Sequence, residues 1–249
     1  MINNTKCVFY FAYFGTDTDD ESIIISRAKY INEQLLFLSN LCDENNINLK
    51  FIVATIPERF SRMLLKIAKE CNFLIYSKYI SDLNNYEYNG ISACIEFAEQ
   101  GPEALIFYCH SKGSVNKNEL SMGIFKYHCE YNLRWDTDQL KLSDEIYKAG
   151  LFPSEHGWLW HNFFWVKSSY LRDKKLQPDG TRHYYEAFIG EKNNKQAHKN
   201  VISTLPEHFF NAQETLRKNC FYEANDINKC GFLNREFRRL GKKNNKGLQ

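Results

Sequence analysis

The sequence predicts a single α/β domain with a mostly parallel central sheet flanked by helices. Apolar segments with strand character alternate four times with amphipathic, helix-like segments over roughly the first 110 residues, which is typical of a parallel sheet with helices on its faces. The fourth apolar segment, residues 104–109, is apolar throughout, as expected for a strand that is buried on both sides.

Length and composition support a folded protein of this class. The chain has 249 residues, enough for one large domain, and its formal net charge of +2 is too small to indicate a nucleic-acid partner. Its eight cysteines form no CxxC pair and lie mostly in apolar segments, so we expect reduced core thiols in a cytoplasmic protein. Neither a signal peptide nor an apolar run long enough to span a membrane is expected.

The first half supplies the alternating elements of the predicted sheet. Acids at residues 17–21 suit the first turn of a helix, and Gly101-Pro102 suits the end of another. We expect strands at residues 7–14, 49–54, 73–76 and 104–109, and helices at 20–44, 57–71 and 90–99.

The second half departs from this rhythm. The sequence predicts a helix through residues 122–135, a helix over 140–149, an aromatic strand over 158–166 and a short helix over 184–192. We expect one domain at residues 1–225, with a nucleotide-binding half up to about residue 113 and an acceptor half from 114 to 225. Residues 226–249 form a basic tail.

A polar cluster directly follows the fourth predicted strand. His110, Ser111 and Lys112 offer an imidazole, a hydroxyl and a cation, and Gly113 allows a tight turn beside them. Open α/β sheets bind ligands at the carboxyl ends of their strands, so this cluster is the predicted centre of an active site. The competing interpretation is a strand end that is simply solvated.

Several motifs of the chain resemble a group of glycosyltransferases from bacterial capsule and O-antigen loci and from large viruses. Related chains have a Tyr-x-His-Ser/Thr-Lys-Gly strand end and, later, a Gly-Asn-Phe-Trp-Trp-like segment. The likeness covers roughly residues 85–190 and rests on Tyr88-Asn89-Gly90, Tyr108-Cys109-His110-Ser111-Lys112-Gly113, Arg134-Trp135 and His161-Asn162-Phe163-Phe164-Trp165, through Tyr170-Leu171 to Glu186.

This resemblance implies a GT-A fold with a Rossmann-like amino-terminal half. It also implies transfer of a sugar from a nucleotide-sugar donor to a glycan or lipid-linked glycan acceptor, in the synthesis of a surface polysaccharide. The alternative is a non-catalytic glycan-binding or assembly protein with the same fold. A phosphate-transferring enzyme is less favoured, because the sequence has no glycine-rich phosphate loop of the usual kind.

The resemblance assigns two segments to the donor. The loop after the first strand, Tyr13-Phe14-Gly15-Thr16, is expected to face the nucleotide base and ribose. Residues His110, Ser111 and Lys112 stand where GT-A enzymes usually carry an Asp-x-Asp metal site, and Lys112 is expected to pair with the diphosphate.

The use of a divalent cation, manganese or magnesium, is left open. His110 with an acid from elsewhere in the fold is one arrangement that would bind it. Two literal Asp-x-Asp triplets end in Asp19 and Asp138, and both also fit the capping of a helix. Of these, Asp136 and Asp138 are retained as weak metal candidates.

Glu186 is the predicted catalytic base, because the resembling chains also have a glutamate before an aromatic helix at this place. A carboxylate there would remove the proton from the acceptor hydroxyl. The competing interpretation is a glutamate on a surface helix, paired with the nearby Arg182.

The aromatic segment is the predicted acceptor site. Trp160, His161 and Asn162 are expected to line it, because the two polar residues do not suit a plain core strand. Trp158 and Trp165 are further candidates for stacking on sugar rings, although a core strand with buried tryptophans remains the alternative.

The basic tail carries six cations and one acid between Phe232 and Lys246. Such a segment suits peripheral contact with an anionic bilayer, where lipid-linked acceptors reside. A solvated chain end is the competing interpretation, and the more common one.

Overall fold

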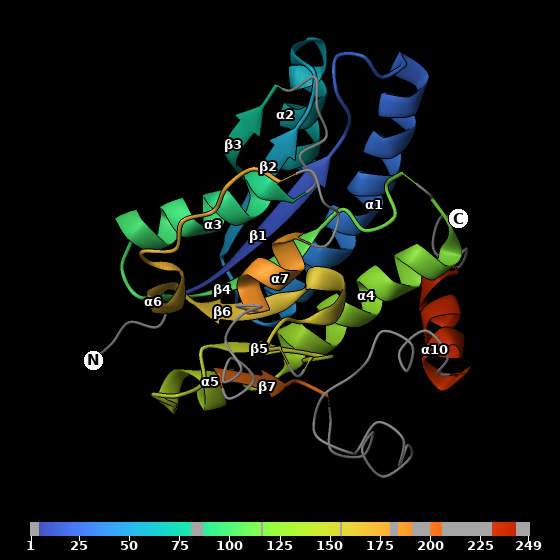
Figure 1. Ribbon diagram of the computed structural model, residues 1–249. Helices are drawn as coiled ribbons and strands as arrows, with labels where there is room; N and C mark the ends of the chain where they lie inside the picture. The colour runs from blue at the N-terminus through green and yellow to red at the C-terminus, as the bar shows by residue number, and fades with distance from the viewer. Residues whose placement is uncertain are drawn as a thin grey trace.

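A seven-stranded sheet forms the centre of the protein (Figure 1). The computed structural model describes residues 5–80, 87–115, 117–154, 156–179, 184–190, 200–205 and 231–242. The strand order is β3-β2-β1-β4-β6-β5-β7, and only β6 runs antiparallel to its neighbours. The strands are β1 (Thr5–Tyr13), β2 (Leu49–Thr55), β3 (Leu74–Tyr79), β4 (Ala104–His110), β5 (Lys148–Gly150), β6 (Phe164–Lys167) and β7 (Val201–Ser203). The predicted mostly parallel α/β class is confirmed.

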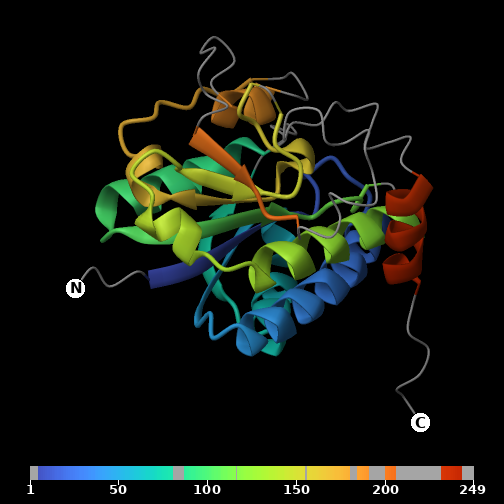
Figure 2. The same ribbon diagram turned by 90° about the horizontal axis from the view of Figure 1, so that it is seen from below.

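Helices cover both faces of this sheet (Figure 2). One face carries α1 (Glu21–Glu44), α2 (Ser61–Glu70), α4 (Glu119–Arg134) and α5 (Asp138–Leu142). The other carries α3 (Tyr88–Gln100), α6 (Ser168–Leu171) and α7 (Tyr184–Gly190). Two 3₁₀ turns, η1 (Glu58–Phe60) and η2 (Trp160–Asn162), and helix α10 (Gly231–Gly241) complete the described elements. None of the described helices is both long and apolar enough to cross a bilayer.

Alternation along the central strands builds two apolar cores. In β1, Val8 and Tyr10 face α1 and α4, whereas Phe9 and Phe11 face α3. All four side chains are at most 3% exposed, and each such burial stabilises the fold by about 1.5–3 kcal/mol. Because both faces are buried, the register of β1 on β4 is fixed, and Phe11 pairs with His110 at the carboxyl edge.

Two predictions for the second half are wrong in detail. The helix expected over 140–149 ends at Leu142, and β5 follows because Ala149 is buried and pairs with Trp165 in the sheet. The strand expected over 158–166 is interrupted by η2, where His161 and Asn162 adopt positive φ angles of 67° and 57°. Strand β7 was not predicted at all, since its three residues carry no periodic signal.

Part of the predicted basic tail packs onto the domain as α10. Phe237 is 2% exposed and joins a small core with Tyr127 of α4. The two helices approach very closely, since a Cβ atom at Gly123 of α4 would lie 1.4 Å from the carbonyl oxygen of Phe237. Arg235, Arg238 and Arg239 remain exposed on the outer side. A solvated end is therefore the wrong expectation for residues 231–241, whereas residues 226–230 and 243–249 lie outside the described part.

We predict that Gly123→Ala separates α10 from α4. The new methyl group overlaps the Phe237 carbonyl, so the free energy of unfolding should fall by about 1–3 kcal/mol and protease should cut the carboxyl-terminal segment faster. Chemical denaturation and limited proteolysis measure the two effects. Arg235→Ala, on the exposed side of α10, is the control, and equal stability of the two variants would contradict the packing described.

Candidate active site

The carboxyl ends of β1 and β4 are joined by their own loops. The backbone N–H of Ser111 donates to the carbonyl of Phe11 at 2.8 Å, and the Ser111 hydroxyl accepts from the N–H of Tyr13 at 3.0 Å. Gly113 then turns the chain at φ 77°, and a Cβ atom there would lie 2.2 Å from Cβ of Ser121. The structure therefore brings the two predicted donor segments, residues 13–16 and 110–112, to one edge of the sheet.

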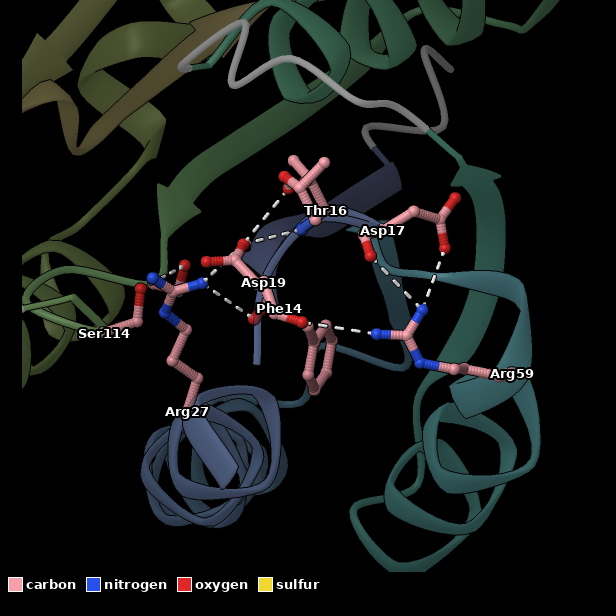
Figure 3. Close-up of polar contacts among 9 residues, drawn as sticks. Phe14, Thr16, Asp17, Asp19, Arg27, Arg59 and Ser114 are labelled. Atoms are coloured by element: carbon pink, nitrogen blue, oxygen red, sulfur yellow. Dashed lines mark hydrogen bonds and ion pairs between the residues drawn. The ribbon is translucent and has the colours of Figure 1, made fainter. Parts of the chain in front are cut away.

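The loop after β1 is held by a largely buried ion pair (Figure 3). Arg27 of α1 lies 3.1 Å from the carboxylate of Asp19 and donates to the carbonyl of Phe14 at 3.2 Å. Asp19 also accepts from the N–H of Thr16 at 2.8 Å. Burial alone would raise the pKa of Asp19, but the Thr16 hydrogen bond and the Arg27 charge outweigh burial and hold that pKa below its ordinary range.

Arg59 holds the same loop from the side opposite Arg27 (Figure 3). Its guanidinium lies 3.3 Å from the carboxylate of Asp17 and donates to the backbone carbonyl of Asp19 at 3.3 Å. Both acids of the first Asp-x-Asp triplet are thus paired with arginines. They hold the loop in place, and the capping role falls to the next residue, Asp20, whose side chain accepts from the N–H of Ser22.

The second triplet lies away from this edge. Asp136 accepts from the N–H of Asp138 at 3.0 Å, and Asp138 pairs with Lys141 at 3.0 Å. Both acids act electrostatically on Lys6, which lies at the opposite end of β1 from Tyr13. The structure does not bring these weak metal candidates to the other predicted site residues. Within the described ranges, no three His, Cys, Asp or Glu residues are grouped to hold a metal ion.

A mostly buried carboxylate lies beside the end of β4. Glu87 precedes α3, and its Oε2 accepts from the hydroxyl of Tyr108 at 3.0 Å and from the amide of Asn162 at 2.5 Å. Only 17% of the Glu87 side chain is exposed. Gly90 makes this approach feasible, because a Cβ atom there would lie 2.7 Å from Cβ of Phe11 and 2.8 Å from the Tyr108 hydroxyl.

A row of three histidines begins beside this carboxylate. His110 Nε2 lies 3.1 Å from the carbonyl oxygen of His161 and 3.8 Å from Oε1 of Glu87. Because a carbonyl only accepts hydrogen bonds, the proton of that bond is on His110 Nε2. His128 Nε2 lies 2.8 Å from His161 Nδ1, while its own Nδ1 is buried without a partner in the described structure. A bare lone pair at that Nδ1 costs less than a buried N–H, so His128 donates to His161.

The electrostatics of the cluster are set by burial. Burial raises the pKa of Glu87 to about 7, although hydrogen bonds from Tyr108 and Asn162 and the charge of Lys112 oppose this rise. Burial likewise lowers the pKa values of His128 and His161 well below their ordinary range, and Lys112 lowers them further. Near neutral pH the imidazoles of His128 and His161 are thus neutral, and the carboxyl group of Glu87 exchanges its proton readily.

Some of the predicted acceptor residues lie beside Glu87 and the histidines, and others pack in a core. His161 and Asn162 contact the cluster, whereas Trp160 is partly buried against the small core formed by α4 and α10. Trp165 is fully buried and its indole N–H donates to the carbonyl of Asn132, so its prediction as a sugar-stacking surface is wrong. Trp158 is half-buried and lies edge-on to Trp160.

The carboxylate found beside the end of β4, Glu87, is not the predicted base, Glu186. Glu186 falls in α7, but its side chain lies outside the described part of the structure, so its role stays a prediction. Glu87 and His128 were not predicted. His128 had a detectable signal, since it shares a helical face with Phe125 and Asn132, whereas Glu87 stood in a polar loop without any pattern.

Comparisons with known proteins give no family. No protein-family model matches the chain, and no curated protein matches it significantly. Among solved structures, a cytidylyltransferase from Leptospira borgpetersenii serovar Hardjo-bovis is similar to the chain with 12% identity and a TM-score of 0.45. The alignment covers 80% of this chain and 75% of that one. Such a distant similarity supports no functional assignment.

We predict that the two loop aspartates differ in their contribution to stability. Asp19→Ala leaves Arg27 and Thr16 without their acceptor in a mostly buried place, so the free energy of unfolding should fall by about 2 kcal/mol. Asp17→Ala breaks a pair whose side chains are 40% and 47% exposed and should cost less than about 1 kcal/mol. Urea denaturation of both variants checks this order, and equal losses would contradict it.

We predict a pH-dependent stabilisation by Glu87→Gln. In the wild-type protein the pKa of Glu87 is raised from 4.5 to about 7 in the folded state. The free energy of unfolding therefore falls as the pH rises from 4.5 to about 7, because the folded state binds this proton more tightly than the unfolded state does. Glutamine avoids this loss of about 3 kcal/mol, at about 1.4 kcal/mol for each pH unit. Denaturation at pH 4.5 and at pH 8 should show a gain at pH 8 alone. A gain of the same size at both pH values would contradict the assignment.

Proposed function

We propose that the protein is a glycosyltransferase that moves a sugar from a nucleotide-sugar donor to a glycan acceptor. The observation that carries this proposal is the Ser111–Tyr13 hydrogen bond, which joins the two loops that the glycosyltransferase resemblance assigns to the donor. The nucleotide would lie along residues 13–16 and the diphosphate along residues 110–112. Ligands of open α/β sheets bind at this edge.

Lys112 is the residue proposed to stabilise the departing diphosphate. Its charge lowers the pKa values of Glu87, His128 and His161, so it acts electrostatically on the centre of the cluster. Negative charge accumulates on the phosphates as the glycosidic bond breaks, and a cation held there stabilises the transition state more than the bound donor. A divalent cation remains an alternative source of this charge.

The acceptor is proposed to be a glycan or lipid-linked glycan of a surface polysaccharide. His161 and Asn162 lie beside the cluster and would contact the sugar that carries the attacking hydroxyl. The exposed arginines of α10, Arg235, Arg238 and Arg239, would suit an anionic bilayer that presents such an acceptor at the cytoplasmic surface.

Calorimetric titration of the protein tests donor binding. The titrants are UDP-glucose, UDP-galactose, UDP-N-acetylglucosamine, GDP-mannose and dTDP-glucose, each with manganese and again with a chelator. We expect one sugar nucleotide to bind in both conditions. Lys112→Ala should weaken its binding about 10- to 100-fold, the range of a charge-assisted contact.

Lys66→Ala is the matched control, because Lys66 lies on α2 with a side chain that is 75% exposed. It should leave the donor affinity unchanged. If binding requires manganese and is unchanged in Lys112→Ala, a metal ion and not Lys112 supplies the positive charge at the diphosphate. Absence of binding for every sugar nucleotide would overturn the transferase proposal and favour a non-catalytic glycan-binding protein.

A further inference from the structure

We infer that Glu87 is the catalytic base, which accepts the proton of the acceptor hydroxyl during sugar transfer. This inference rests on the proposed function and adds a residue that no motif of the sequence indicated. In the step, the acceptor oxygen forms a bond to the anomeric carbon as its proton passes to the Glu87 carboxylate. The bond from that carbon to the phosphate oxygen breaks, and its electron pair leaves on the nucleoside diphosphate.

The two oxygens of Glu87 have different surroundings. Oε2 accepts from both Tyr108 and Asn162 and is thereby fixed in position. Oε1 accepts no hydrogen bond from the described residues and lies 3.8 Å from His110 Nε2. The carboxylate is thus held by one oxygen while the other keeps its lone pairs for a proton. Since 17% of the side chain is exposed, the group is reachable from solvent.

The position of Glu87 suits attack on a donor bound at the proposed place. His110 is the last residue of β4, and Ser111 and Lys112 follow it directly, so the carboxylate lies next to the segment assigned to the diphosphate. A base must be within hydrogen-bond reach of the attacking hydroxyl, and that hydroxyl must be close to the anomeric carbon. We expect the acceptor hydroxyl to bind against Glu87, on the face of the donor sugar opposite the diphosphate.

The surrounding charges favour reversible proton transfer. Among the described residues, the groups that face Glu87 are Tyr108 and His110 of β4, Lys112 of the following loop and Asn162 of η2. His128 and His161 lie behind them, and burial keeps both imidazoles neutral near pH 7. Burial also brings the pKa of Glu87 to about 7, where a base combines sufficient ionisation with proton affinity.

Asn162 is a positioning residue in this arrangement. It adopts φ 57°, next to His161 at 67°, and two consecutive non-glycine residues in this region cost free energy. The turn places the carbonyl of His161 on His110 and the amide of Asn162 on Glu87. Because this amide stabilises the ionised carboxylate, its removal raises the pKa of Glu87.

The test compares Glu87→Gln with the wild-type protein in donor binding and in turnover. Donor affinity is measured by calorimetry with the sugar nucleotides named above, and turnover by release of the nucleoside diphosphate with octyl glycosides or water as acceptor. We expect unchanged donor affinity and a loss of turnover of about 10²- to 10⁴-fold, the usual contribution of a general base. Glu96→Gln, on the exposed face of α3, is the control with unchanged turnover.

Two further measurements separate catalysis from a folding defect. The kcat/KM of the wild-type protein should rise with pH and level off above about pH 7, and Asn162→Ala should move this limb to higher pH. Nuclear magnetic resonance of the first product formed should show an inverted anomeric configuration, as a single displacement requires.

The outcomes distinguish this inference from the proposed function. If Glu87→Gln binds the donor and turns over at the wild-type rate, or if the product retains its configuration, Glu87 is not the base, although the transferase proposal stands. Loss of turnover in Glu186→Gln instead would assign the role to Glu186. If the wild-type protein binds none of the sugar nucleotides, both proposals fail.

Discussion

The parallel pairing of β1 with β4 is the constraint on which the site depends. Both strands pack against an apolar core on each face, so a shift by one residue would exchange the side chains of the two cores and break their close packing. Their carboxyl ends consequently open at the same edge, where Phe11 pairs with His110 and Ser111 contacts Tyr13. Residues that are about 100 positions apart in the chain thereby form one polar surface.

Several local features that lower the stability of the fold are needed to hold the Glu87 carboxylate at this edge. Gly90 allows the first turn of α3 to approach β1 and β4, and Asn162 adopts an unfavourable backbone conformation to reach Glu87. Behind them His128 is buried, and its Nδ1 has no partner among the residues that the structure describes. Each feature lowers the stability of the fold, and all of them lie around one titratable group, Glu87. Destabilising features are commonly clustered in this way around groups that take part in chemistry.

The sequence indicated the framework of this site better than its chemistry. The apolar run before His110 predicted both the strand and the edge at which it opens, because a doubly buried strand has a clear pattern. The two Asp-x-Asp triplets were ambiguous, since acids also stabilise the first turns of helices, and the structure pairs Asp17 and Asp19 with arginines. Glu87 could not be predicted, because its direction depends on Gly90 and on the turn at Asn162.

The titration of Glu87 tests this account most directly. Carbon-13 resonance of selectively labelled glutamate, assigned by comparison with Glu87→Gln, reports the ionisation of this carboxyl group in the folded protein. We predict a midpoint near pH 7 that moves upward in Asn162→Ala. A midpoint close to the ordinary glutamate value of about 4.3 would show that the carboxylate is well solvated, and would contradict both its burial and its role as the base.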